Sequence, residues 1–244
     1  MGWWGRSDYY KPYVSAGEKR RRAEKAAAKL FKGGGTQMPV RLEGRAIAGS
    51  FWGKAWCANL ESYSDYSNRL PRGRSYVRNG SVNHLDIRRG GIEALVSGSR
   101  LYTVKITIAP VKEERWKALC RECAGSIGSL MELLGGKLSQ RVMEIMTRRD
   151  FGLFPSPKET KLDCSCPDWA EMCKHVAAAL YGVGARLDEK PELLFLLRHV
   201  SHQDLVSDSS AVTALTGAKT GADHATLSTA EISEVFGIDM AAGK

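Results

Sequence analysis

The clearest pattern in the chain is an alternation of apolar and polar residues over positions 76–109. It falls into three runs, VNHLDIRR, GIEALVSG and LYTVKITIA, which are separated by turn residues at 90–91 and 97–100. Alternation with period two is typical of half-buried strands, and short turns between such runs favour hairpins. The pattern therefore predicts an antiparallel β-meander. A further alternation in MPVRLEGRAI, residues 38–47, predicts another strand ahead of it.

Apolar residues at helical spacing mark the segments on both sides of the meander. Ser15 and Glu18 form a capping-box pattern before KRRRAEKAAAKLFK, and three glycines at 33–35 end this segment. FWGKAWCANLESY and residues 113–149 also show helical spacing, the latter with a break at Gly135-Gly136. We interpret the aromatic residues of FWGKAWCANLESY as buried core and not as a surface for base stacking.

One cluster of cysteine and histidine has the spacing of a complete metal-binding set. The segment CSCPDWAEMCKH contains Cys164, Cys166, Cys173 and His175. Three thiolates and one imidazole form a tetrahedral set for Zn²⁺, and a set that leaves no position for water is structural. Residues two apart on a helix point in roughly opposite directions, so we expect Cys173 at the cap of a helix and His175 in its first turn. The other two ligands end the extended segment KLDCSC, and the sequence predicts one structural zinc ion.

The predicted fold class is α+β, and the chain divides into five segments. The class combines an antiparallel β-meander and helices with a small CxCxnCxH zinc-finger unit of extended segment, turn and helix. Residues 205–227 lack aromatic side chains and are rich in Ser, Thr, Ala, Gly and Asp, which is typical of a linker. The expected segments are a basic N-terminal arm or helix, 1–35; an α+β domain, 36–157; the zinc finger with its following helices, 158–204; a flexible linker, 205–227; and a short C-terminal helix, 228–244, which either docks on a partner or folds back.

A second pair of cysteines, Cys120 and Cys123, has the C-x-x-C spacing that also occurs in metal sites and redox motifs. No partner pair follows it, and no βαβ pattern surrounds it. The two residues fall at helical spacing with Trp116 and Leu119, which favours buried core cysteines over a second metal site or a redox pair.

The charge of the chain is unevenly distributed. Residues 1–163 contain 30 Lys and Arg against 16 Asp and Glu, whereas residues 164–244 contain 6 against 11. A basic body with an acidic tail indicates a polyanionic partner, and the alternative is a solvated basic surface that serves solubility alone. Arginine forks suit phosphate oxygens. The candidate nucleic-acid-binding residues lie in the basic helix, itself either a phosphate-binding arm or merely exposed, and in or beside the meander: Arg20, Arg21, Arg22, Arg72, Arg74, Arg78, Arg88 and Arg89.

Several functional classes have no support in the sequence. The first residues, MGWWGRSDYY, lack a signal-peptide pattern, and no run of 18 apolar residues occurs, so we expect a cytoplasmic protein without a membrane partner. Neither a nucleophile–base pair, a Gly-rich phosphate loop nor a carboxylate pair with motif spacing is present. We therefore expect neither catalysis nor a small-molecule substrate.

The pattern C-x-C, spacer, C-x-H resembles the SWIM zinc finger family. The segments PDWAEMCKHVAAALYGVG, LDEKPELLFLLR, VSAGEKRRRAEKAAAKL, GRAIAGSFWGKAWCANLE and GLFP are also similar to bacterial SWIM proteins that accompany Swi/Snf-type helicases. The resemblance implies zinc ligation by the four residues named above, together with DNA or protein interaction. Two hypotheses follow: a nucleic-acid-binding accessory factor, with DNA as the expected partner, or a protein-interaction adaptor for a Swi/Snf-type helicase that makes no nucleic-acid contact itself.

Overall fold

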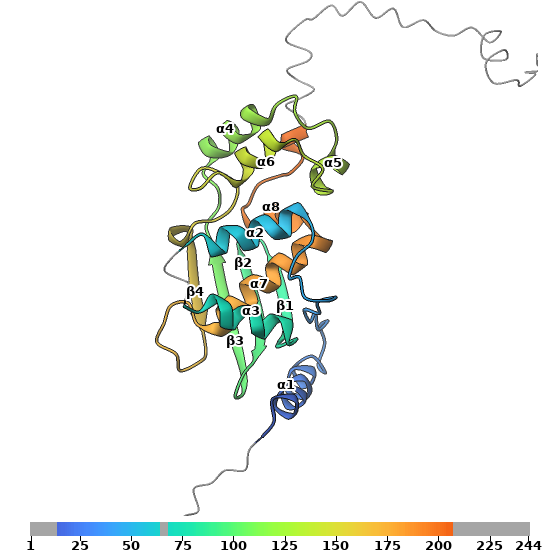
Figure 1. The fold of residues 1–244 in the computed structure, drawn as a ribbon, viewed down its shortest axis with the longest axis vertical. Coiled ribbons are helices and arrows are strands. Elements are labelled where there is room, and N and C mark those ends of the chain that lie inside the picture. Colours follow the sequence, from blue (N-terminus) through green and yellow to red (C-terminus); the bar gives the residue numbers. More distant parts are fainter. Residues whose placement is uncertain (1–13, 64–67, 207–244) are drawn as a thin grey trace, which may run out of the picture.

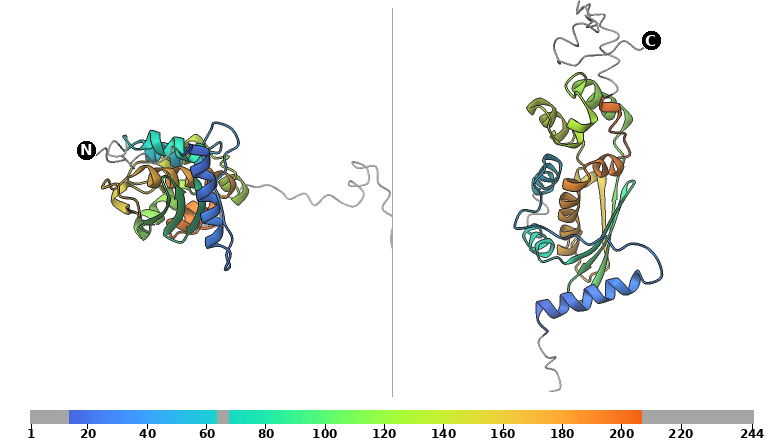
Figure 2. Two further views of the ribbon diagram at one scale, coloured as in Figure 1. Left: turned by 90° about the horizontal axis from the view of Figure 1, so that it is seen from below. Right: turned by 90° about the vertical axis from the view of Figure 1, so that its right-hand side faces the viewer.

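The computed structural model describes residues 14–63 and 68–206, which form a four-stranded antiparallel sheet with helices on one of its faces and at its ends (Figure 1 and Figure 2). The predicted α+β class is confirmed. In chain order the elements are α1 (Ala16–Leu30), α2 (Phe51–Glu61), α3 (Leu70–Arg78), β1 (Val82–Arg88), β2 (Gly91–Ser97), β3 (Leu101–Ile108), α4 (Glu113–Cys123), α5 (Leu130–Leu134), α6 (Gln140–Thr147), a short 3₁₀ helix (Pro157–Glu159), β4 (Thr160–Cys164), α7 (Lys174–Glu189) and α8 (Glu192–Leu197). None of the described helices is long and apolar enough to cross a membrane.

The sheet has the order β1-β2-β3-β4, and its first three strands are the predicted meander. Register places Ala94 opposite Val104 and Glu93 opposite Lys105, so apolar and polar residues occupy opposite faces. Ala94, Val104 and Ile106 are buried, whereas Glu93 and Lys105 are exposed. The apolar residues of the alternating pattern therefore lie on the buried face of the sheet, and the polar residues lie on its exposed face.

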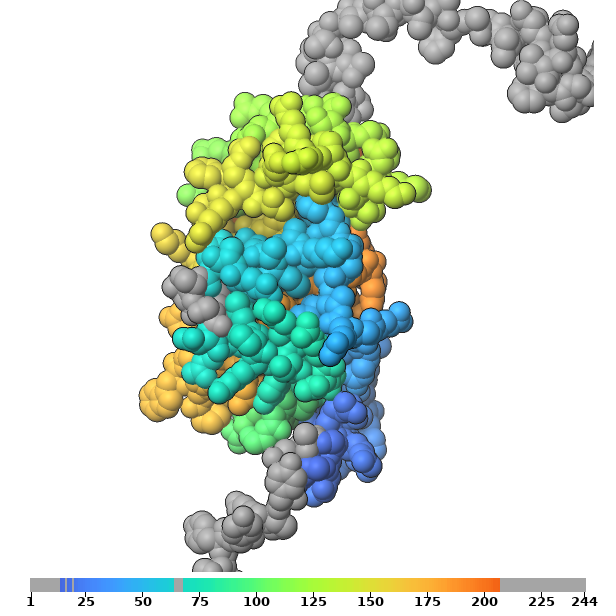
Figure 3. Space-filling view, viewed as in Figure 1, coloured from blue at the N-terminus to red at the C-terminus, as the bar shows by residue number. Residues whose placement is uncertain are grey.

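Helix α7 covers the apolar face of the sheet, and α2 and α3 cover α7 in turn. Figure 2 shows α7 between the sheet and these two helices, and Figure 3 shows that α2 and α3 form the outer surface. The indoles of Trp52 and Trp56 on α2 are buried and donate to the carbonyls of Leu133 and Leu180, at 2.8 Å each. The predicted core role of these aromatic residues is confirmed.

Close backbone approach joins α3 to α7. A β-carbon on Gly73 would overlap the side chain of Ala177, so the absence of a side chain at this position is what lets the two helices meet. Leu70 and Val77 lie on the same buried face of α3. The sequence pattern did not predict this helix, and Arg72, Arg74 and Arg78 consequently lie on α3 and not in or beside the meander.

The strand predicted over residues 38–47 is wrong. This segment forms no strand, although Val40 donates to the carbonyl of Val82 and Leu85 donates to that of Met38. Met38 N–H donates to the His84 side chain at 3.1 Å and not to a backbone carbonyl, and the register of β1 shifts between Val82 and His84, so no regular ladder forms beside β1. The alternation is present, but the segment is an irregular chain at the sheet edge.

Other predicted elements are confirmed where the structure describes them. Ser15 caps α1 by accepting from Glu18 N–H, and residues 113–149 form three helices with a break after α5 at Gly135. Residues 207–244 contain nearly all of the predicted linker and the predicted tail helix, and they lie outside the described residues. The proposed segment boundaries stay predictions.

A buried ion pair fixes α8 to the segment before β4. Arg198 is fully buried, donates to the carbonyl of Ala109 at 2.6 Å and pairs with Glu159 at 2.7 Å. Arg115 also reaches Glu159 at 3.2 Å. Burial opposes ionisation of the Glu159 carboxyl, but the hydrogen bonds from Arg198 and from Ser156 N–H, together with the charges of Arg198 and Arg115, outweigh it and lower the pKa of Glu159.

We predict that Glu159→Gln lowers the free energy of unfolding at neutral pH by about 3 kcal/mol, because it leaves a buried guanidinium without its counter-charge. Since the folded-state pKa of Glu159 lies below its unfolded value, its contribution is complete above the unfolded pKa and disappears as pH falls through the folded one. The deficit of the variant should therefore shrink on acidification. Urea unfolding between pH 7 and pH 3 measures this. Glu122→Gln, which breaks the exposed pair with Arg148, is the matched control and should cost about 1 kcal/mol or less.

Candidate metal centre

Four ligand side chains come from the end of one strand and the start of one helix. Cys164 is the last residue of β4, and Cys166 follows two residues later. Cys173 is the N-cap of α7, with extended backbone angles, and its sulfur accepts from Val176 N–H at 3.5 Å. His175 lies in the first turn of the same helix. This is the placement that the two-residue spacing between Cys173 and His175 predicted.

The four ligand atoms converge on one point. The three sulfurs and the histidine nitrogen all lie within 4.8 Å of one another. His175 Nδ1 is 3.9 Å from Cys164 Sγ and 3.8 Å from Cys173 Sγ. Atoms bound tetrahedrally to one zinc at its usual bond lengths lie about 3.6–3.8 Å apart, so the arrangement fits a single zinc ion with little movement.

The electrostatics of the cluster favour a thiolate at Cys173. The Cys164 thiol donates to the sulfur of Cys173 and, with the His175 imidazole and Val176 N–H, lowers the pKa of Cys173 to about 3 despite burial. The pKa of Cys164 is raised, because its proton is held between the two sulfurs and because it is partly buried. A divalent cation would replace that proton, and metal binding therefore releases protons from the site.

Two of the cysteines outside the cluster are neutral thiols with a raised pKa. Burial raises the pKa of Cys57 to about 12 and that of Cys123 to about 11, so both stay neutral thiols at physiological pH. Cys120 and Cys123 are buried on α4, which confirms their predicted core position. No disulfide joins any of the six cysteines. Across residues 14–63 and 68–206, the cluster at 164–175 is the one metal-binding arrangement that these residue types form.

Aromatic rings and a glycine enclose the histidine ligand. The imidazole of His175 lies 4.4 Å from the Tyr102 ring and 5.5 Å, edge-on, from the Tyr76 ring. A β-carbon on Gly98 would lie 2.7 Å from His175 Nε2, so the turn after β2 rests directly on the ligand. His175 is 3% exposed, and its Nε2 has no hydrogen-bond partner among the described residues. Packing from α3, β3 and this turn therefore sets the orientation of the ring.

The donor set defines the class of this site as a closed, structural zinc centre. Three thiolates and an imidazole fill a tetrahedral shell and leave no coordination position for water or substrate. Residues 148–183 match the family model described as SWIM zinc finger. All four ligands fall within that match, and the chain therefore carries a SWIM zinc finger that is able to bind one zinc ion.

A curated relative extends the similarity beyond the finger. A protein of Mycobacterium tuberculosis, described as "Uncharacterized protein Rv2102", is 37% identical over 183 residues, which are 74% of this chain and 65% of that protein. The chain thus spans less than two thirds of the length of this relative. No solved structure matches the chain.

The structure does not bring the eight candidate arginines to one face. Arg20, Arg21 and Arg22 lie on α1, and Arg20 donates to the carbonyl of Asn79 at the end of α3, so α1 and the carboxyl end of α3 are neighbours. Arg72, Arg74 and Arg78 lie on α3, where Arg74 is paired with Glu61 at 3.0 Å.

Arg88 and Arg89 lie at the opposite end of the sheet from α1. Arg88 ends β1 and Arg89 lies in the turn that follows, and the length of β2 separates them from the turn that α1 contacts. Arg88 is paired there with Asp86 at 2.6 Å. The basic helices and the β1–β2 turn are therefore separate surfaces.

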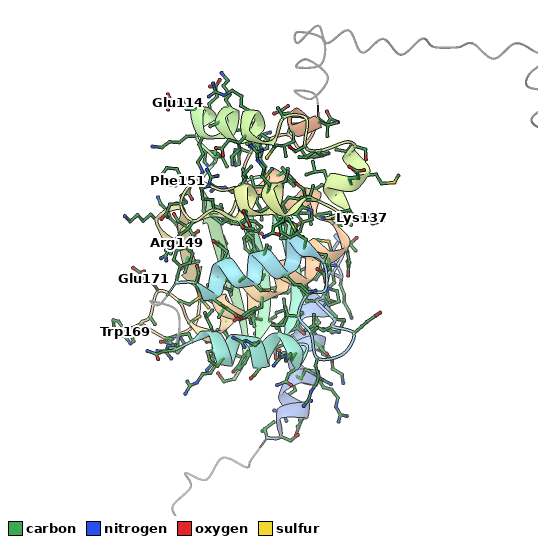
Figure 4. All side chains as sticks on the ribbon, turned by 45° about the horizontal axis from the view of Figure 1, so that its top comes forward. Glu114, Lys137, Arg149, Phe151, Trp169 and Glu171 are labelled. Atoms are coloured by element: carbon green, nitrogen blue, oxygen red, sulfur yellow. The ribbon has the colours of Figure 1, made fainter. Side chains whose placement is uncertain are left out.

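One exposed aromatic residue of the finger was read from the sequence only as part of a turn. Trp169 lies between Cys166 and Cys173, its side chain is 101% exposed, and it points away from the body of the protein (Figure 4). Asp168 beside it is paired with Arg69 at 3.3 Å. The signal in the sequence was a large aromatic residue inside a metal-binding loop too short to have a core of its own.

We predict that Cys173→Ser lowers the zinc content from one ion per chain to well below one and reduces the melting temperature. Structural zinc contributes about 10–16 kcal/mol in finger peptides, and this residue is both a ligand and the N-cap of α7. Elemental analysis and calorimetry measure the two effects. Cys123→Ala, which removes a buried neutral thiol outside the cluster, should keep one zinc per chain. Equal zinc contents in the two variants would contradict the assignment of the ligands.

Proposed function

We propose that the protein is a nucleic-acid-binding accessory factor, with DNA as the expected partner, in which the zinc centre is structural and no reaction is catalysed. The observation that carries the proposal is the position of α1. Ala23 and Ala27 are buried and fasten this helix across the end of the sheet, whereas Arg21, Arg22 and Lys25 face solvent. Because the buried alanines fix the helix against the sheet, the positions of its basic residues relative to the rest of the protein are also fixed.

The charges on this helix are only partly neutralised. Arg22 pairs with Glu18, and Arg20 lies 3.8 Å from Glu24. None of the ion pairs within the described residues involves Arg21, Lys25 or Lys29, and all three are exposed. Cations held in place without counter-charges release condensed counterions when they meet phosphates, and this release favours binding to a nucleic-acid backbone of any sequence.

We predict that the full chain binds duplex and single-stranded DNA with an affinity that falls steeply as salt rises. The log–log slope should be about −0.9 for each phosphate neutralised on a duplex and about −0.7 on a single strand. In the double variant Arg21→Gln with Lys25→Gln, one to two fewer phosphates should be neutralised. The log–log slope against salt should therefore be closer to zero by the amount that those phosphates contribute. Fluorescence anisotropy at several salt concentrations measures it.

Lys137→Gln with Arg141→Gln is the charge-matched control for this pair. Both of its residues are exposed, and they lie in the α5–α6 region at the other end of the molecule (Figure 1). The control should retain the wild-type slope. Absence of any DNA binding by the wild-type chain at low salt would refute the proposed function.

A second function is favoured by Trp169. Tryptophan is enriched among the residues that dominate protein interfaces, and Trp169 is fully exposed on a loop that zinc would hold at both ends. In this alternative the protein is an adaptor for a Swi/Snf-type helicase and makes no nucleic-acid contact of its own.

We predict for this alternative that Trp169→Ala weakens binding to a purified Swi/Snf-type helicase of the same organism by at least tenfold, with zinc content unchanged. Phe151→Ala, which removes another exposed aromatic side chain outside the finger, is the control and should bind as the wild type does. Isothermal titration calorimetry measures both. If the Trp169→Ala and Phe151→Ala variants bind the helicase equally well, the finger loop does not contact the helicase.

A further inference from the structure

A cavity of about 630 Å³ lies beside the zinc centre, where four parts of the fold meet. Its walls come from α1, from the carboxyl end of α3 and the residues after it, from the turn that follows β2, and from the first residue of α7. The polar residues of the wall are Arg20, Tyr76, Asn79, Ser81, Ser97, Ser99 and Lys174. The volume is that of a pocket for a ligand of nucleotide size.

The lining of this cavity is cationic. It includes the side chains of Arg20 and Lys174, and no carboxylate is among the described residues that line it. Lys174 Nζ stands 5.8 Å from the centre of the Tyr76 ring, and no ion pair among the described residues involves it. Arg20 reaches across to the carbonyl of Asn79 at 3.0 Å, which holds its guanidinium at the wall, and it lies 3.8 Å from the Glu24 carboxylate, which does not line the cavity.

A neighbouring hollow of about 280 Å³ continues this surface. The two share Val14 and Ser99 as walls, and Arg22, which is paired with Glu18, and Arg100 line the second one, with no carboxylate among the described lining residues. Arg100 lies over the Tyr102 ring at 5.4 Å. Two adjacent cationic hollows suit a chain with repeated phosphates better than a single small anion, which would fill only one of them.

The zinc centre supports the wall of the first cavity. Lys174 stands between the ligands Cys173 and His175, and the Tyr76 ring lies against the His175 imidazole. Gly98, another wall residue, rests on His175 Nε2. Fixing the imidazole by coordination therefore also fixes three parts of the cavity.

We propose that this cavity is a phosphate subsite for a single nucleic-acid strand, in which Lys174 and Arg20 contact one backbone phosphate and Arg22 and Arg100 contact the next. The inference rests on the proposed function, because it names the place where the strand would bind. The hydroxyl of Ser81 and the amide of Asn79 supply neutral donors at the same wall.

The experiment compares charge-matched double variants for binding to a fluorescent twelve-nucleotide oligothymidylate, in the full chain with zinc content measured for each. Arg20→Gln with Lys174→Gln should weaken binding at least tenfold and reduce the salt slope by about 0.7 for each phosphate that the variant no longer neutralises. Lys137→Gln with Arg141→Gln should bind as the wild type does. Because Lys174 adjoins two zinc ligands, Arg20→Gln with Arg100→Gln is a second test that leaves the finger untouched, and it should also weaken binding at least tenfold.

The outcomes separate the two levels of the proposal. If the zinc-loaded variant Arg20→Gln with Arg100→Gln binds the oligonucleotide with the affinity and salt slope of the wild type, the subsite is refuted. The proposed function is not affected by that result. Failure of the wild-type chain to bind any oligonucleotide at low salt overturns both. Inorganic phosphate serves as a competitor in the same assay. We expect it to weaken oligonucleotide binding only as much as its contribution to ionic strength explains. Competition at far lower concentration would show a site for a small anion instead of a strand.

Discussion

The convergence of four side chains on one metal position is the constraint on which the architecture depends. It joins the last residue of β4, the edge strand, to the first turn of α7, the helix that covers the apolar face of the sheet. Structural zinc contributes about 10–16 kcal/mol, which is comparable to the whole stability of a domain at about 5–15 kcal/mol. Helices α2 and α3 pack on α7, and the β2–β3 turn rests on His175. The position of one ion therefore affects the sheet, α7 and the two helices that cover α7.

Patterns that act locally were readable from the sequence. The meander followed from period-two alternation, because one face of β1–β3 is covered by α7 and the other is solvated. The cap and first turn of α7 followed from the geometry of Cys173 and His175, since two residues that are two apart cannot both reach one metal from the middle of a helix. The zinc-ligand set could be predicted for the same reason: four ligands within one short segment need few contacts from distant parts of the chain.

Features that depend on distant partners could not be read in this way. Helix α3 has few apolar residues, and its packing depends on Gly73 meeting Ala177 about a hundred positions away. The strand predicted at 38–47 did not form, because the His84 side chain accepts from Met38 N–H where a ladder would need a backbone carbonyl, and the apolar pattern gives no sign of this contact. The face on which each arginine lies was also undetermined, since partners such as Glu61 for Arg74 and Asp86 for Arg88 are supplied by the tertiary fold.

The most direct test of the central claim is X-ray absorption at the zinc edge of the native full-length protein, together with its zinc stoichiometry. The structure predicts one zinc per chain, with three sulfur ligands at about 2.3 Å and one nitrogen ligand at about 2.0 Å. A protein without stoichiometric zinc, or a coordination shell in which oxygen replaces one of these four ligands, would contradict the account of a closed centre that joins the sheet to its central helix.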